Sequence, residues 1–262
     1  MNAKSGTKTF LYRTFAVFMI ALLALAALPV NSAFARPMAA VAQRGTATTA
    51  TTTNSSLVFS ALPSGVTAGD VMIVNISQRG DDATNPTSSG WTLIQGAALR
   101  SGPGSSGDYR GAVLYKVAGA SETAPTFTLG ASVTNAVGAI VAFSGVDTSG
   151  ATPFDVTPVA ILANTGGSAS VGATSITTAS ANAPVIMFGM AASNPATWSG
   201  WTTTSPGALT ELYDAQTTSA SVGAAWATKA SAGSTGAGAA TIAPSSQNGG
   251  ILIFCMDQEM FS

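Results

Sequence analysis

Aspartate and glutamate are the side chains of this sequence that could act as an acid and a base. The chain contains no histidine, which removes Ser-His-Asp and Cys-His catalysis, histidine-ligated zinc and the usual proton shuttle. A pair of carboxylates could still hydrolyse a glycosidic bond. No pair stands out, because most carboxylates follow the pattern of turns and strand ends, where Asp accepts local backbone hydrogen bonds. We therefore expect no enzyme and rank a glycoside hydrolase lowest among the alternatives; the carboxylates considered are Asp70, Asp81, Asp82, Asp108, Glu122, Asp147, Asp155, Glu211 and Asp214.

The stretch RGDDATN, residues 79–85, offers hard oxygen ligands of the kind that calcium prefers. Asp81, Asp82 and Asn85 would supply them. The stretch lacks the Asp-x-Asp-x-Asp-Gly spacing and the closing glutamate of an EF-hand loop. The sequence favours a solvated turn here over a calcium site, and it predicts no other cofactor.

Aromatic rings beside polar loop residues suggest a second chemistry, because a flat ring can stack on the apolar face of a sugar. The rings considered are those of Trp91, Trp198, Trp201 and Tyr109, and the ligand-binding candidates kept are Trp198, Trp201 and Tyr109. Ser-Gly-Trp-Thr occurs twice, 110 residues apart, which favours core positions for Trp91 and Trp201 at equivalent places. A core position is also favoured for Trp198, but this tryptophan has no counterpart in the first half of the chain. Trp198 is therefore the better candidate for an exposed ring that binds carbohydrate.

Short apolar segments, rich in β-branched residues and bounded by Gly, Pro, Asn and Ser, must position these side chains. Helical periodicity is absent from the chain after its first forty residues, and many short strands between turn-rich loops predict an all-β sandwich or barrel. Segments such as GAIVAFSGV are apolar on both faces, which is typical of strands covered on both sides. The expected strands are 56–62, 70–78, 91–99, 111–119, 126–130, 135–146, 174–180, 184–193, 210–216, 222–230, 238–244 and 249–256.

The same order of features recurs at offsets of 110 to 114 residues. VMIVNIS from Val71 matches VIMFGMA from Val185, and NAVGAIVAF from Asn135 matches NGGILIF from Asn248, with Phe143 opposite Phe254. This period is far longer than a solenoid unit. The pattern predicts a jelly-roll-like antiparallel β-sandwich of two similar halves, about 55–147 and 170–256, joined by an ordered crossover. One sandwich over 55–262 is favoured over two separate domains.

The N-terminal segment, residues 1–35, has the parts of a secretory signal peptide: basic residues, an apolar run of about 14 residues and Ala-Phe-Ala. That run is short for a membrane span, so an uncleaved anchor is the lesser alternative. Residues 36–54 are a Thr-rich leader, either flexible or an edge strand supplied to a neighbour. We expect a secreted, extracellular or cell-surface protein, with the periplasm as an alternative, that has no membrane segment after cleavage.

Charge argues against nucleic acid as a partner. Once the three basic residues of the signal segment are removed, 7 basic and 11 acidic residues remain, a net charge near −4. Binding to a phosphate backbone requires clustered Lys and Arg, and no such cluster follows the signal segment.

Four stretches carry a resemblance: GDVMIVNIS, SGWTLI, AVLYKVAGASE and AVGAIVAFSGVDTSGATPFDV. In them the chain resembles a broad group of poorly characterised secreted and phage-associated β-sandwich modules. Their pattern is a GD-led strand, a GWT turn, a YKVA strand that ends in G-x-SE, and an SGVD segment. The resemblance implies a jelly-roll-like fold and an extracellular or surface role, and it brings no catalytic residues.

We therefore expect a non-catalytic exported β-sandwich with a structural or adhesive role that associates with itself. The apolar two-sided strands and the Thr-rich leader favour self-association, since unpaired strand edges are joining surfaces. The alternative is a carbohydrate-binding module whose partners are surface glycans.

Overall fold

The computed structural model describes residues 40–102, 107–192 and 197–255, all of which belong to one compact unit. The expected signal segment 1–35 and the start of the leader lie outside the described residues. Every regular element in the described part is a β-strand, and every strand pair is antiparallel. The prediction of an all-β, jelly-roll-like sandwich of two similar halves is confirmed.

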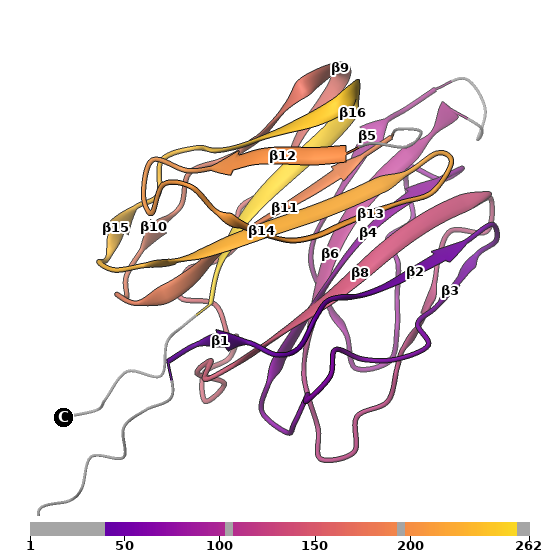
Figure 1. Ribbon diagram of the computed structural model, residues 1–262. Helices are drawn as coiled ribbons and strands as arrows, with labels where there is room; N and C mark the ends of the chain where they lie inside the picture. Colours follow the sequence, from indigo (N-terminus) through magenta and orange to yellow (C-terminus); the bar gives the residue numbers. More distant parts are fainter. Residues whose placement is uncertain (1–39, 103–106, 193–196, 256–262) are drawn as a thin grey trace, which may run out of the picture. The chain divides into compact units, whose positions relative to one another are not determined.

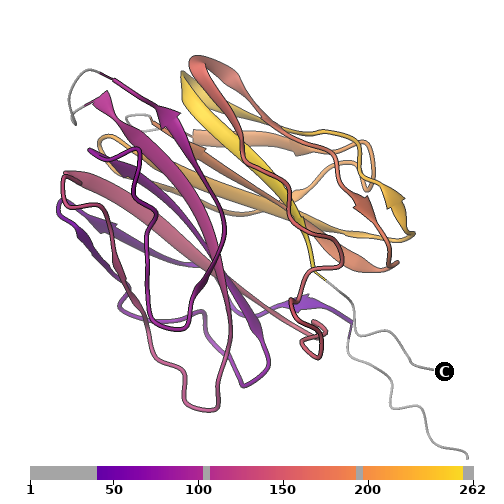
Figure 2. The same cartoon turned by 180° about the vertical axis from the view of Figure 1, so that it is seen from behind.

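Two six-stranded sheets contain most of the strands (Figures 1 and 2). The first, called the N-sheet, has the order β1-β8-β4-β6-β5, with β2 also paired to β8. Its strands are β1 (Ala42–Gln43), β2 (Thr48–Thr52), β4 (Val71–Arg79), β5 (Thr92–Arg100), β6 (Tyr109–Val117) and β8 (Asn135–Ser144).

The second, called the C-sheet, has the order β12-β16-β11-β14-β13, with β9 also paired to β16. Its strands are β9 (Leu162–Ala173), β11 (Ala183–Ala191), β12 (Thr197–Thr202), β13 (Thr210–Gln216), β14 (Ser221–Lys229) and β16 (Gly238–Phe254). Two small ribbons complete the fold, β3 (Ser56–Val58) with β7 (Thr126–Thr128) and β10 (Thr177–Thr178) with β15 (Gly233–Ser234).

The strand order repeats between the halves. The run β8-β4-β6-β5 of the N-sheet corresponds to β16-β11-β14-β13 of the C-sheet, and each half adds one ribbon. The register of the sequence repeat does not carry over to the sheets. Val71 pairs with Phe143 and Val185 with Phe254, but the first pair lies in the apolar layer between the two sheets and the second pair lies on the other face of the C-sheet. The asparagines of the sequence repeat lie opposite strand ends: Asn135 opposite Arg79 of β4, and Asn248 opposite Ala191 of β11.

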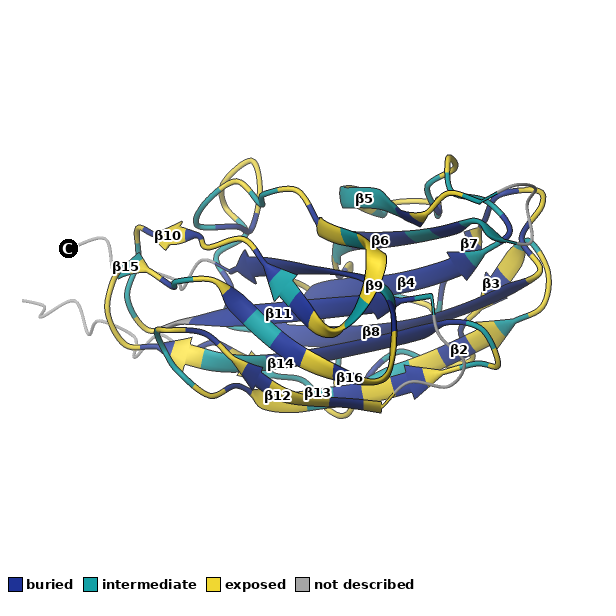
Figure 3. Cartoon of the chain, turned by 90° about the horizontal axis from the view of Figure 1, so that it is seen from above, coloured by how far each residue is buried: buried dark blue, intermediate teal, exposed yellow. Residues whose placement is uncertain are grey.

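The two sheets share one apolar layer, called the central core. Val71 and Ile73 of β4 contribute to it from the N-sheet, and Ile186 and Phe188 of β11 from the C-sheet. Figure 3 shows the inner strands buried along nearly their whole length. The halves are therefore packed through their main sheets.

Each sheet also has an apolar layer on its other face. In the N-outer core, the ribbon residues Leu57 and Phe127 cover Met72 of β4. In the C-outer core, Trp198 and Ile242 cover Met187 of β11. Strands that are apolar on both faces are therefore covered on both sides, as the sequence predicted. Leu114 of β6 is likewise 1% exposed in the N-outer core, although the charged Lys116 lies on the same face of that strand.

β16 connects the two layers of the second half. Its C-terminal part pairs with β11, its N-terminal part pairs with β12, and β9 pairs with it between Gly238 and Gly250 (Figures 1 and 2). The β9–β16 register shifts on both sides of Ser246, where the strands bend from the sheet into the outer layer. Gly167 lies opposite this bend and has φ +80°, a conformation that glycine adopts readily.

The segments around the two sheets are also part of the fold. The leader supplies β1 and β2, which pair with β8 of the same chain, and Val41 is buried in the central core. In the crossover, Phe154 and Ile161 are buried in the central core, and Phe154 packs edge-on against Tyr115. The ordered crossover was correctly predicted.

Candidate functional site

Trp198 lies in the C-outer core and is 4% exposed. Its ring covers Gly189 and Gly223, which face each other across β11 and β14. The indole N–H donates a hydrogen bond to Ser221 Oγ at 2.6 Å. The predicted core position of Trp198 is confirmed. The alternative prediction, an exposed ring that binds carbohydrate, is wrong, because the two glycines leave a space that the indole fills.

Trp201 is 5% exposed and stacks on Trp198, with ring centroids 5.3 Å apart and planes 20° apart. In the first half, Trp91 packs edge-on against Phe127 in the N-outer core. Each tryptophan of the repeated tetrapeptide packs on the outer face of its own sheet; the predicted core position is confirmed for Trp201, whereas Trp91 is only partly buried. Their places differ in detail, since Trp201 lies inside β12 and Trp91 directly precedes β5.

Tyr109 is 7% exposed and lies in the central core, on the other side of the C-sheet from the two stacked tryptophans. Trp198, Trp201 and Tyr109 are therefore all buried; the two tryptophans stack on each other, but Tyr109 lies apart from them.

Glu211 and Asp214 of β13 are brought to the same side by a bulge between Glu211 and Tyr213. Glu211 Oε2 accepts the indole N–H of Trp201 at 3.1 Å, and Asp214 Oδ2 accepts the backbone N–H of Trp198 at 3.0 Å. Partial burial and the negative charge of Glu211 raise the pKa of Asp214, and the hydrogen bond from Trp198 only partly offsets them. The two carboxylates hold β12 against β13, and both residues are also exposed.

The predicted calcium ligands do lie close together, around the guanidinium of Arg110. Arg110 Nε donates to Asn85 Oδ1 at 2.5 Å and Nη1 donates to the backbone oxygen of Asp82 at 2.6 Å. Asp81 Oδ1 accepts the backbone N–H of Thr84 at 2.7 Å, and its Oδ2 accepts the Thr84 hydroxyl at 2.9 Å. The described residues contain no group of three or more His, Cys, Asp or Glu side chains placed for a metal ion. The arrangement is that of a hydrogen-bonded turn whose cation is Arg110.

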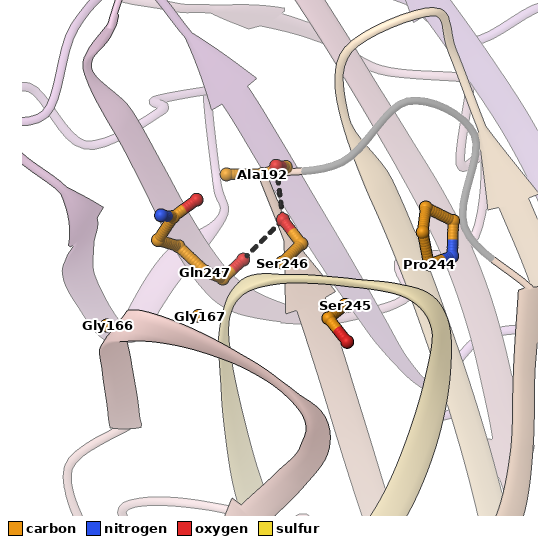
Figure 4. Close-up of a pocket in the computed structure, with 7 residues that line it drawn as sticks. All are labelled: Gly166, Gly167, Ala192, Pro244, Ser245, Ser246 and Gln247. Carbon is orange, nitrogen blue, oxygen red and sulfur yellow. Dashed lines mark hydrogen bonds between the residues drawn. The ribbon is translucent and has the colours of Figure 1, made fainter.

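The fold contains a polar hollow of about 430 Å³ at the bend of β9 and β16 (Figure 4). Ser246 Oγ donates to the backbone oxygens of Ala192 and Gln247, and Gln247 O also accepts the N–H of Ala192. These groups hydrogen-bond to one another and stabilise the bend. The remaining lining comes from Gly166, Gly167, Pro244 and Ser245.

A second hollow, of about 510 Å³, lies where the two sheets meet at the leader. Asn135 of the N-sheet joins the turn between β13 and β14 here, because Thr217 Oγ1 donates to Asn135 Oδ1 and Asn135 Nδ2 donates to Thr218 Oγ1. This polar contact connects the two halves.

A third hollow, of about 400 Å³, lies beside Trp91 and contains the ion pair of Lys116 and Glu122. From the sequence, Trp91 is a candidate sugar-stacking ring for which a core position is favoured, Glu122 is one of the carboxylates considered, and Lys116 is not a candidate. A signal was present, because GWT, YKVA and G-x-SE are three of the motifs that carry the resemblance, and in the folded chain these three motifs line one hollow.

Comparison of the chain with models of known protein families, with curated proteins and with solved structures finds no match. The resemblance to secreted and phage-associated modules therefore stays a prediction. In the described part of the chain, no helix is long and apolar enough to cross a membrane.

Proposed function

We propose that this chain is a non-catalytic exported β-sandwich with a structural or adhesive role outside the cytoplasm, and that copies join through the free edge of β9. The observation that carries the proposal is the composition of this edge. β9 spans 12 residues, contains no charged residue and no proline, and pairs only with β16 among the described strands.

Natural proteins guard free strand edges with charged side chains, prolines or bulges, because an open edge invites pairing with another chain. The edge strands at the other end of each sheet are guarded in this way: β5 ends in Arg100, and β13 contains Glu211 and Asp214. β9 has only its central bulge, and most of its side chains are exposed, including Leu162 at 49%. Its main-chain groups are suited to pairing with a strand of a second copy.

The equivalent edge of the first half has the same character. β2 pairs only with β8 among the described strands, and its sequence is Thr-Thr-Ala-Thr-Thr. Each sheet therefore has one charged edge and one edge of small, hydroxyl-bearing residues. A non-catalytic role is supported by Glu211 and Asp214, which accept hydrogen bonds from the tryptophans of β12.

The edge proposal is tested with two lysines at exposed positions of β9, Thr165→Lys with Ala169→Lys. We expect the exported wild-type chain to elute as an oligomer in size-exclusion chromatography with light scattering, and this variant to elute as a monomer. The reason is that lysines repel one another across a paired edge and must be desolvated there.

The matched control places the same two charges on the guarded edge, Thr210→Lys with Gln216→Lys of β13, both exposed. This control should stay oligomeric, and both variants should melt near the wild-type temperature. A wild-type chain that is monomeric at high concentration, or a β9 variant that still oligomerises, refutes the proposal.

A further inference from the structure

The hollow beside Trp91 lies on the outer face of the N-sheet and is built from three segments. They are the turn before β5 with Ser88 and Ser89, Lys116 of β6, and the loop with Glu122 and Thr126 that leads into β7. Its volume of about 400 Å³ falls within the range of small-molecule sites, about 300–1,000 Å³. Hydroxyl groups and an ion pair make up most of its polar lining.

The ion pair is held in one position. Lys116 Nζ lies 2.5 Å from Glu122 Oε1, and Glu122 Oε2 accepts the backbone N–H of Gly119 at 3.0 Å. Partial burial acts to raise the pKa of Glu122, but the hydrogen bonds from Lys116 and Gly119 outweigh it and the pKa lies below its usual value. Glu122 is thus an ionised acceptor at neutral pH, beside a cationic donor.

This pair suits a ligand hydroxyl, which can donate to the carboxylate and accept from the ammonium at once. A ligand with a net charge would have to compete with one member of the pair. The hollow therefore favours neutral ligands with several hydroxyl groups.

Trp91 provides an aromatic wall. The preceding Gly90 has φ +75°, and a Cβ at this position would lie 3.1 Å from Lys116 Cε, so the turn packs directly over the lysine. Edge-on packing against the fully buried Phe127 fixes the ring, which stays half-buried. Among the described residues no group accepts a hydrogen bond from the Trp91 indole N–H, in contrast to Trp198 and Trp201.

The second half encloses its repeated tryptophan and its β14 lysine more fully. Trp201 is 5% exposed and its N–H is bonded to Glu211, and Lys229 is 3% exposed and donates to the backbone oxygen of Ser231. Trp91 and Lys116 are both more accessible than these two residues.

We propose that this hollow binds a neutral saccharide, with one sugar ring against Trp91 and its hydroxyls on Lys116 and Glu122. An indole face matches the apolar face of a pyranose, and the indole N–H and the hydroxyls of Ser88 and Ser89 supply further hydrogen bonds. The proposal is independent of association through β9.

The test is an array of neutral and acidic oligosaccharides probed with the full chain, followed by saturation-transfer NMR and calorimetric titration with the best neutral binder. We expect binding to neutral glycans. Glu122→Gln should weaken it at least about tenfold, because a hydrogen bond to a charged group is lost. Trp91→Phe, which keeps the packing on Phe127, should weaken it as well and remove the saturation transfer from the indole.

Glu211→Gln is the matched control, because it neutralises a carboxylate beside a tryptophan in the other half and should leave the affinity unchanged. The β9 lysine variant should also bind normally, which separates this site from self-association. A folded chain that binds no glycan, that binds only acidic glycans, or whose Glu122→Gln and Trp91→Phe variants bind like the wild type overturns the proposal.

Discussion

Gly189 and Gly223 face each other across β11 and β14, and the ring of Trp198 fills the space that two side chains would occupy. A Cβ at Gly189 would lie 2.4 Å from the Trp198 ring, and one at Gly223 would lie 2.7 Å from it. Glycine inside a strand often marks such a close approach by another group. The glycines therefore decide that Trp198 lies in the core.

Replacing Gly189 by alanine should overpack the C-outer core and lower the free energy of unfolding by about 1–3 kcal/mol. Gly172→Ala in β9 is the control, because its Cβ would meet only the terminal methyl of the Leu162 side chain, at 3.1 Å. Urea unfolding of both variants measures the difference. Equal effects of the two substitutions would show that contact with Trp198 does not constrain this position.

The sequence favoured a core position for Trp198, but it could not show which residues enclose the ring. The residues that enclose it, Gly189 and Gly223, come from two other strands, and only strand pairing brings them together. The same holds for Lys116 and Trp91, whose proximity depends on the β5–β6 pairing and on the turn at Gly90. The stretch of Asp81, Asp82 and Asn85 was correctly predicted as a turn, but the sequence could not show that Arg110 reaches this turn from β6.

At the scale of elements, Asn75 joins the two sheets through a hydrogen bond inside the central core. Its Nδ2 donates to the backbone oxygen of Gly189 at 2.9 Å and to that of Gly223 at 3.4 Å. The buried hydroxyl of Tyr213 lies beside it without a hydrogen bond of good geometry. Burial raises the pKa of this tyrosine, and the Asn75 amide acts in the opposite direction.

The two side chains should respond differently to substitution. Asn75→Leu should lower the free energy of unfolding by about 1–3 kcal/mol, because two backbone oxygens in the core lose their side-chain donor. Tyr213→Phe should leave stability unchanged or raise it, since the removed hydroxyl is buried without a full partner. Thermal and urea unfolding measure both, and a larger loss for Tyr213→Phe would contradict this assignment.

The strands could be predicted where they bury apolar side chains. The predicted segments 70–78 and 135–146 correspond closely to β4 and β8. β9 and β12 were missed, because Ser, Thr, Gly and Asn dominate them and their order comes from pairing with β16. β16 was divided into two expected strands, because its polar bend resembles a turn in sequence.

At the scale of the whole molecule, the two halves share the central core. In the N-sheet, Val71, Ile73 and Phe143 are fully buried and belong to this layer, which Phe188 and Ile253 of the C-sheet also form. A half on its own would expose this face to water. The repeat predicted the two halves, but it could not predict that their main sheets pack against each other.

The full chain should therefore unfold in a single calorimetric transition, with equal calorimetric and van't Hoff enthalpies. A fragment that ends at residue 147 should aggregate or bind a hydrophobic dye, because it lacks the cover of the C-sheet. Two separate transitions, together with a soluble and folded fragment, would show that the halves are independent domains.

The last strand of each half lies inside its sheet. β8 pairs with β1, β2 and β4, and β16 pairs with β9, β11 and β12. Because β16 is the last of the described strands along the chain and lies in the interior of the C-sheet, this sheet cannot close before its other strands have been synthesised. Pairing over such long sequence separations is also slow. The C-sheet therefore depends for its closure on the arrival of its final strand, and until then β9 and β12 have no partner among the described strands.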